Sequence, residues 1–500
     1  MADMGDGGPA LSGREGRGDE GGSVAAGLTR WRYAFVTAFV ILLAIKLVIA
    51  CTLSPFGDEA FYWMESRRLA WGYSDLPPLT AWLIRLGESV AGHSLLGMRW
   101  PFLLLGSALP WLTVWFAREA FGRRAGWQAG LLCLALPLAG SLGVLALPDV
   151  PLTVSILLAM LALLRAMRDD RLADWCLLGV ALALAWATHY RAAMAMLAGL
   201  LVLTLTARGR RQWRRGGFWL AMVLAAMGLV PLVISNWQQH GAGIAFQAVE
   251  RNSWQFKPDA MIQPLEQALA CTPLLYALLL YVAWICWRRR REGAPWDVVA
   301  LMSLGFVVPY FVLGLFADDL RFRVHWPLPG YLPLLGAVPV CCAAWTQTRS
   351  GRWFLRCAFV LAAMGQLGGM TYLAMAASTG GAAALTSVKA FPANFVGWRE
   401  SATMAEHWAK NNATVLVADN FMLAAELEFQ RGAPPVYALD SPLNVKHGRA
   451  PQLAIWQLNE AGLRAMHPGA PVVLAVDETA LRARERAAWL GQVCSRIAQL

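Results

Sequence analysis

The sequence predicts a mostly α-helical protein that crosses a membrane many times and ends in a small α/β soluble domain. Of its 500 residues, 57% are apolar and only 15% are charged, which excludes an ordinary soluble enzyme. Apolar runs of roughly 17 to 25 residues, the length of a transmembrane helix, recur along most of the chain. Beyond residue 376 the pattern changes to polar sequence and then to short alternating strands and helices.

The apolar runs predict about eleven transmembrane helices. They are residues 33–53, 96–117, 126–147, 150–167, 172–188, 192–207, 218–236, 265–287, 298–316, 329–345 and 354–375. Residues 1–29 lack apolar periodicity, so we expect a disordered cytoplasmic tail. No small-residue cleavage site follows the first run, which we expect to remain as a span. The predicted domains are therefore the tail, a transmembrane catalytic domain over residues 30–376 and an α/β domain over residues 377–500.

The positions of the arginines predict how the chain is oriented. With a cytoplasmic N-terminus, every cluster between the runs falls on the cytoplasmic side, as the positive-inside rule requires. The clusters comprise Arg118, Arg123 and Arg124; Arg165, Arg168 and Arg171; Arg208, Arg210, Arg211, Arg214 and Arg215; Arg288 to Arg291; and Arg349, Arg352 and Arg356. A net charge of +11 that is distributed in this way is a topology signal, so we expect no nucleic-acid partner. The other loops and the C-terminal domain are expected outside the cytoplasm.

The C-terminal domain is predicted to contain three strands and at least two helices. Residues 414–418, 436–439 and 472–476 read as strands, and residues 421–430 and 478–490 read as helices. Asp419, Asp477 and Glu478 lie at strand ends, where acids either form a site or cap turns. In a domain this small, the second role is the commoner one.

The first external loop carries the strongest functional signal. At helical spacing, residues 57–71 place apolar and polar side chains on opposite faces, which predicts a helix lying in the membrane interface. Asp58 and Glu59 begin this helix. Two acids there are favourable with the helix dipole, but a pair directly after a transmembrane span favours a function, because such groups are costly near lipid.

Further polar residues fall in the other external loops. Asp75 precedes the double proline Pro77-Pro78, and Asp149 begins a span just before Pro151. Several basic residues in external turns are candidates for binding a phosphate, namely Arg191, Arg251, Arg321, Arg323 and His325. For Arg321 and Arg323 the alternative is simple pairing with Asp318 and Asp319.

These motifs, in this order, resemble a known family. Asp58-Glu59 with Tyr62 and Trp63, then Gly72-Tyr73-x-Asp75-x-Pro77-Pro78-Leu79, then Asp149-x-Pro151, are similar to the GT-C membrane glycosyltransferases related to protein O-mannosyltransferases and to the aminoarabinose transferase that modifies lipid A. The likeness covers roughly residues 54–345. Looser matches are Asn236-Trp237, His325-Trp326-Pro327 and Gly397-Trp398.

The resemblance implies a GT-C fold, a bacterial inner-membrane location with a periplasmic C-terminal domain, and a set of site residues. Asp58, with Glu59 beside it, would be catalytic. Asp75 and Asp149 would line the same external cavity and would hold a divalent cation if one is used. Tyr62 and His189 are expected to contact substrate with the basic residues named above. Relatives often carry lysine where this chain has Leu76 and His189, so the cation that holds the lipid phosphate is not fixed by the likeness.

The expected reaction moves a sugar from a polyprenyl-phosphate donor to a glycolipid, polysaccharide or protein acceptor, with inversion. It needs a base for the acceptor hydroxyl and positive charge at the departing phosphate. We expect no nucleotide site, because no Gly-rich phosphate loop follows a strand. A lipid or sugar transporter or flippase is the alternative for a protein with many spans. A non-enzymatic assembly or receptor protein is a third hypothesis, which leaves the acidic first loop unexplained.

Overall fold

The computed structural model describes residues 16–250, 254–316, 324–386, 391–412, 414–432, 434–478 and 483–497. Among these residues, six helical segments are long and apolar enough to cross a membrane, or seven if one strongly bent helix pair counts as a single span. The six are described first. They are α1 (Gly16–Thr52), α4 (Leu95–Phe121), α7 (Asp149–Asp169), α11 with α12 (Gly216–Met227 and Val230–Gln238), α16 (Trp296–Gly314) and α18 (Arg349–Ala376). The predicted multi-pass helical fold is confirmed, whereas the number of about eleven crossings stays a prediction.

The remaining predicted spans are shorter or broken helices. Three are 14 to 17 residues long, namely α8 (Leu172–Thr188), α9 (Ala192–Leu205) and α17 (Leu328–Cys341). Two are interrupted at a proline, which lacks an N–H and clashes with the preceding turn. These are α5 (Arg123–Ala135) followed by α6 (Pro137–Gly140), and α14 (Gln263–Cys271) followed by α15 (Pro273–Arg289), where the chain bends by 113°. Pro137 and Pro273 begin the second helix of each pair.

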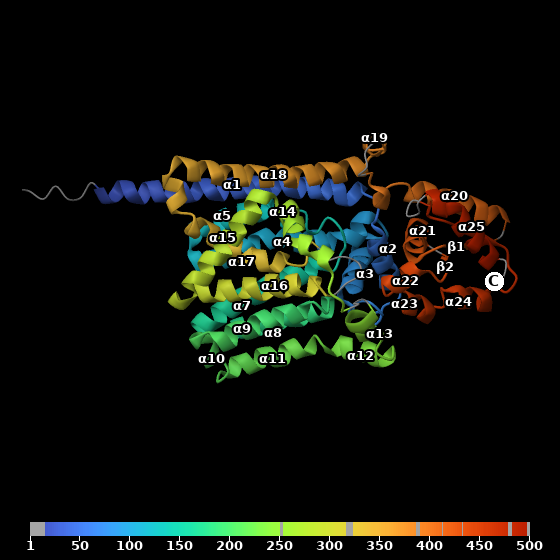
Figure 1. Ribbon diagram of the computed structural model, residues 1–500, viewed down its shortest axis with the longest axis horizontal. Coiled ribbons are helices and arrows are strands. Elements are labelled where there is room, and N and C mark those ends of the chain that lie inside the picture. Colours follow the sequence, from blue (N-terminus) through green and yellow to red (C-terminus); the bar gives the residue numbers. More distant parts are fainter. Residues whose placement is uncertain are drawn as a thin grey trace, which may run out of the picture.

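Short elements connect the longer helices. They are α3 (Leu79–Ala91), α10 (Ala207–Gln212), α13 (Ala242–Ala245), α19 (Thr379–Ala384) and the helical turns η1 (Phe246–Glu250), η2 (Pro258–Ile262), η3 (Arg290–Glu292), η4 (Ala344–Gln347) and η5 (Ala393–Phe395). Figure 1 shows the long helices as a bundle with α1 and α18 along one edge and α11 along the opposite edge. The C-terminal part covers one end of this bundle, beside α2 (Gly57–Arg67) and α3.

The C-terminal part forms a small parallel sheet between helices. The strands β1 (Val415–Ala418), β2 (Tyr437–Ala438) and β3 (Val472–Ala475) lie in the order β2-β1-β3 and confirm the three predicted strands. Val417 is in register with Tyr437, and Val415 is in register with Val472. The helices are α20 (Trp398–Asn412), α21 (Phe421–Arg431), α22 (Pro442–Lys446), α23 (Ala450–Ile455), α24 (Glu460–Met466) and α25 (Ala483–Ile497). The predicted division at residue 376 coincides with the end of α18, and we propose it as a domain boundary.

Two expectations for the N-terminal region are corrected. Helix α1 begins at Gly16, so residues 16–29 are helical and not a disordered tail; residues 1–15 lie outside the described residues. Adding residues to an existing helix costs far less than nucleating a new one, so the apolar span can extend a helix into this stretch.

Helix α2 does not lie in the membrane interface with one face exposed. Nine of its eleven residues are buried, including the polar residues Glu65 and Ser66. One side packs on α3 and another on α21, and one hydrophobic cluster joins α2, α3 and α4 to β1 and α21. The C-terminal part packs on both expected faces of α2: the apolar Phe61 contacts Phe421, and the polar Glu65 contacts Arg449.

Candidate active site

One cavity of about 250 Å³ brings most of the predicted site residues together. It lies where the first loop, the start of α7 and the turn between α8 and α9 meet the C-terminal part. Seven predicted residues line it: Asp58, Tyr62, Asp75, Asp149, His189, Arg191 and His325. Residues from loops far apart in the sequence therefore share one site, as the resemblance implied.

Asp58 is the accessible carboxylate on one side of the cavity. It lies in the first turn of α2, which begins just after Pro55, and its side chain is 24% exposed. Its Oδ1 atom lies 3.5 Å from Arg449 Nη2 and 3.9 Å from His447 Nδ1. These contacts leave room for a substrate hydroxyl to reach the carboxylate, as a general base requires.

Glu59 does not share this role, which corrects the expectation of a catalytic pair. Its carboxylate is fully buried and accepts hydrogen bonds from Arg99 at 2.7 Å (Nε) and 2.6 Å (Nη2), and from the Ala146 N–H at 2.7 Å. Successive helix residues point about 100° apart, so neighbours in α2 cannot both face the cavity. Glu59 holds α2 against α4.

Asp75 lies in a buried cluster with Glu65 and Arg449. Arg449 Nη1 is 2.5 Å from Asp75 Oδ2 and 3.3 Å from Glu65 Oε1. Burial raises the pKa of Glu65 well above its usual range, and the nearby Asp75 carboxyl raises it further. Burial also raises the pKa of Asp75 and of Tyr62, while the positive charge of Arg449 opposes both increases. The cluster therefore favours a proton on Glu65, shared with Asp75.

The opposite side of the cavity combines Asp149 with basic groups. Arg191 Nη2 lies 2.6 Å and His325 Nε2 lies 3.2 Å from Asp149 Oδ1. The Arg191 guanidinium also stacks over Trp326, 5.3 Å from the ring centroid. The helix ends place these side chains at the cavity, because Asp149 lies in the first turn of α7 and Arg191 is the N-cap residue of α9.

His189 completes this basic side. It ends α8, and its Nδ1 atom accepts the Arg191 backbone N–H at 3.1 Å. In the neutral ring the proton is then on Nε2, which makes His189 a hydrogen-bond donor. Arg191, His325 and His189 together offer the N–H donors that bind a phosphate.

Some predicted residues fall elsewhere. Arg251, Arg321 and Arg323 lie outside the described residues, so their role stays a prediction. Asp419 is buried at the end of β1 and does not line the cavity, and burial raises its pKa to about 6. Within the described ranges, no group of three or more His, Cys, Asp or Glu side chains is placed to hold a metal ion. Asp75 and Asp149 each pair with an arginine.

The structure adds cavity residues that the sequence reasoning missed. His447 and Arg449 come from the segment between α22 and α23, and Phe246 and Gln247 come from η1. The basic run Lys446-His447-Gly448-Arg449 in the C-terminal part was the available signal.

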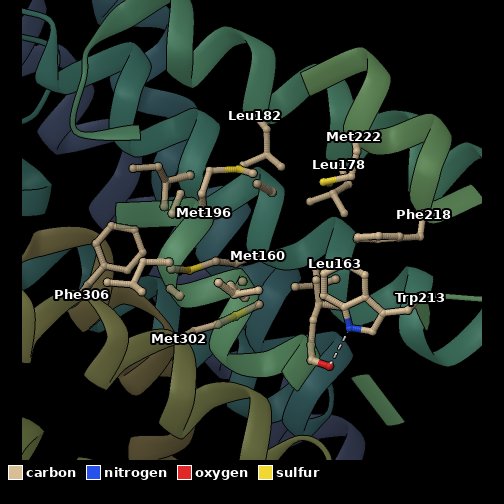
Figure 2. A pocket seen from close by; sticks show the side chains of 18 of the residues that line it. Met160, Leu163, Leu178, Leu182, Met196, Trp213, Phe218, Met222, Met302 and Phe306 are labelled. Carbon is tan, nitrogen blue, oxygen red and sulfur yellow. Dashed lines mark hydrogen bonds between the residues drawn. The ribbon is translucent and has the colours of Figure 1, made fainter. Parts of the chain in front are cut away.

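A second, larger cavity of about 490 Å³ lies among the membrane helices and is lined by apolar side chains. Figure 2 shows methionine, leucine and aromatic side chains from α7, α8, α9, α11 and α16 converging on it. Along α9 its lining runs from Ala195 to Leu203, which at 1.5 Å per residue is about 6 to 18 Å beyond Arg191. An apolar cavity of this kind fits a hydrocarbon chain.

Comparison with known proteins supports the fold. Residues 75–235 match the family model of dolichyl-phosphate-mannose-protein mannosyltransferase. A crystal structure of ArnT from Cupriavidus metallidurans in the apo state superposes with a TM-score of 0.64 at 16% identity, over 90% of this chain and 93% of that chain. The same protein bound to undecaprenyl phosphate gives 0.61 at 16% identity, over 89% and 93%. A sequence search of curated proteins finds no match.

The superposition covers nearly the whole chain and therefore establishes the fold, and the matched segment contains Asp75, Asp149, His189 and Arg191. The chain therefore shares the fold of ArnT, has several helices long and apolar enough to cross a membrane, and over residues 75–235 is similar to the dolichyl-phosphate-mannose-protein mannosyltransferase family.

Proposed function

We propose that the protein transfers a sugar from a polyprenyl-phosphate donor to a hydroxyl group of a glycolipid, polysaccharide or protein, with inversion at the anomeric carbon. The observation that carries this proposal is the arrangement of the 250 Å³ cavity, which has Asp58 on one side and Arg191 with His325 on the other. A base and a phosphate-binding group thus face one space large enough for a sugar.

Asp58 acts as the general base. The acceptor oxygen attacks the anomeric carbon while its proton passes to the Asp58 carboxylate. The bond between that carbon and the phosphate oxygen breaks, and its electron pair leaves with the polyprenyl phosphate. One displacement inverts the configuration.

Arg191 and His325 stabilise the departing phosphate. Arg191 uses Nη2 on Asp149, and its Nε atom is buried without a hydrogen-bond partner. A buried donor of this kind is costly unless a ligand satisfies it, so it favours an anion in the cavity. In a site with little water, a positive charge stabilises the transition state most when it lies beside the atom on which negative charge develops, here the departing phosphate oxygen.

The apolar cavity supports a lipid-linked donor. The end of this cavity nearest Arg191 begins at Ala195, about one turn further along α9. A hydrocarbon chain attached to a phosphate at Arg191 can therefore reach it. Met160, Met196, Met222 and Met302 in its wall can adapt to a branched isoprenoid chain. The similar ArnT structure with undecaprenyl phosphate favours the same class of ligand.

The proposed site faces the extracytoplasmic side. In Figure 1, α10 with its arginines lies at the end of the bundle opposite α2 and α22. By the positive-inside rule, the arginine end is cytoplasmic. A membrane-impermeant maleimide should therefore label the exposed position Asp440→Cys from outside intact cells, and labelling only after lysis would contradict this orientation.

Mass spectrometry of the lipid that copurifies with the protein tests the proposed donor. We expect a polyprenyl phosphate, with or without its sugar. The sugar-bearing lipid, returned to purified protein in phospholipid vesicles with extracted envelope glycolipid as acceptor, should give a product of inverted anomeric configuration. Movement of lipid between leaflets without any glycosylated product would favour the flippase hypothesis instead.

A further inference from the structure

Arg449 connects the C-terminal part to the carboxyl groups of the first loop. It caps the start of α23, is 2% exposed and has a guanidinium group within 3.5 Å of three carboxyl groups. These groups are Asp58 and Glu65 of α2 and Asp75 of the following loop. Arg449 is more than 370 residues away from each of them in the sequence, so only the folded chain brings them together.

The guanidinium is shielded from water on its flat faces. Its carbon atom lies 4.4 Å from the centre of the Phe61 ring, 4.9 Å from that of Tyr62 and 5.5 Å from that of Phe421. Aromatic rings attract a cation without neutralising it, and water is too scarce there to screen it. The charge of Arg449 therefore acts strongly on the neighbouring carboxyl groups.

A contribution to folding stability does not by itself explain this cluster. Arg449 Nε is buried without a hydrogen-bond partner. Burying charged groups is costly, and that cost is recovered only when the geometry is good and further hydrogen bonds satisfy the remaining polar atoms. Three carboxyl groups around one arginine whose Nε atom is unsatisfied indicate a functional reason for keeping the charge.

We propose that Arg449 is a positioning residue for the proposed base: it orients the carboxylate of Asp58 and places a positive charge beside it, so the C-terminal part completes the active site of the membrane part. This inference rests on the proposed function. Arg449 itself need not touch the substrate, because it acts through Asp58.

The net charge of this cluster explains why the base needs Arg449. With one proton shared by Glu65 and Asp75, the cluster carries two negative charges and the single positive charge of Arg449. Removing the guanidinium leaves two negative charges close together in a buried site, where protonation of Asp58 relieves the repulsion. A protonated Asp58 cannot accept the proton of the acceptor. The other charged or titratable groups around Asp58 are His447 and Tyr62 beside it, and Asp149, His189, Arg191 and His325 across the cavity.

The backbone around Arg449 is fixed to the first loop. The Ser74 N–H donates to Gln452 Oε1 at 3.0 Å, and the Ser74 hydroxyl donates to the Gly448 carbonyl at 2.6 Å. These bonds flank Arg449 on both sides. Docking of the C-terminal part thereby sets where the guanidinium lies.

The test compares Arg449→Gln with the control Arg464→Gln, an exposed arginine in the same part of the chain. Transfer from the copurified polyprenyl-phosphate sugar is measured from about pH 4 to pH 9, a range that includes the ordinary aspartate pKa, together with binding of undecaprenyl phosphate alone. For Arg449→Gln we expect the acidic limb of the transfer rate to move to higher pH, and on that limb each unit of displacement lowers the rate about tenfold at a given pH. The loss should shrink as the pH rises, and binding should stay within about twofold.

Two further variants keep the test decisive. Arg449→Lys retains the charge but cannot bridge several carboxylates, so it should restore part of the activity. Arg449→Gln with Asp75→Asn removes one positive and one negative charge, so the acidic limb should move back toward that of the unmodified protein, whatever the absolute rate. An acidic limb that stays in place in Arg449→Gln, or a uniform loss of rate at every pH, would overturn the inference.

A readout independent of transfer separates failure of this inference from failure of the proposed function. Absence of transfer by the unmodified protein with any polyprenyl-phosphate sugar would reject the proposed function. Hydrogen exchange of residues 57–76 would still report on Arg449: exchange should accelerate in Arg449→Gln and stay unchanged in Arg464→Gln. Unchanged exchange in both variants would reject the coupling between the two parts of the chain.

Discussion

Arg99 and Glu59 form a fully buried two-pronged ion pair, with N···O distances of 2.7 and 2.6 Å, one residue away from the accessible Asp58. Arg99 also donates to the carbonyl oxygens of Ala50 and Leu53 at the end of α1. The two acids at the start of α2 therefore have different roles: Glu59 fixes the helix, and Asp58 faces the cavity.

Replacing Glu59 with Gln should destabilise the protein. The change leaves the buried Arg99 without its counter-charge, and breaking one partner of a buried pair costs about 3 to 5 kcal/mol. Thermal unfolding in detergent should show a lowered Tm, whereas Asp58→Asn should unfold close to the unmodified protein. Equal Tm values for Glu59→Gln and the unmodified protein would show that this pair does not hold α2.

Replacing Arg191 with Gln should weaken binding of the lipid phosphate. Loss of a charge-assisted hydrogen bond costs about 1.5 to 3 kcal/mol, or roughly 10- to 150-fold in affinity. Binding of undecaprenyl phosphate is measured directly, with the exposed Arg208→Gln at the arginine-rich end as the control. Equal affinities for the two variants would place the phosphate elsewhere.

The buried Glu65 should make stability depend on pH. Its pKa is raised in the folded protein, mainly by burial, so its contribution is fully present below the ordinary glutamate pKa and is lost as the pH rises toward the raised value. The Tm of the unmodified protein should therefore fall as the pH rises above the ordinary glutamate pKa of about 4.3. Glu65→Gln mimics the protonated form and should flatten this slope; an identical slope would mean that Glu65 does not titrate in this way.

The apolar cavity can be filled from α9. A Cβ atom added at Gly199 meets no atom within 4 Å, and the same is true of Gly368 on the outer helix α18. Both positions gain helix propensity when glycine is replaced, so both variants should fold. Gly199→Phe should weaken binding of undecaprenyl phosphate, and Gly368→Phe should not. Equal binding by both would remove the cavity from the donor site.

Much of the fold was accessible from the sequence because membrane insertion imposes a simple rule. An apolar run of sufficient length must become a helix in lipid, and every run predicted here is a helix or a broken pair. The breaks at Pro137 and Pro273 were not predicted. The three strands of the C-terminal part followed from their short apolar runs.

The site was accessible only in part. Asp58, Asp149 and Arg191 could be placed in one compartment, because topology assigns each loop to one side of the membrane. Glu59 was assigned wrongly, because its partner Arg99 lies inside a helix and no local pattern pairs them. Arg449 was missed for a related reason: a contact across more than 370 residues has no local signature, and an arginine in a soluble domain usually faces water.

The most direct test of the account is single-turnover transfer by Asp58→Asn, with the exposed Asp440→Asn as the control. Asparagine keeps the size of the side chain but cannot accept the acceptor proton, and loss of a general base costs about 10²- to 10⁴-fold. We predict that loss for Asp58→Asn, with normal binding of undecaprenyl phosphate and a normal rate for Asp440→Asn. Transfer by Asp58→Asn at a rate close to that of the unmodified protein would contradict the account, because no other role is assigned to this carboxylate.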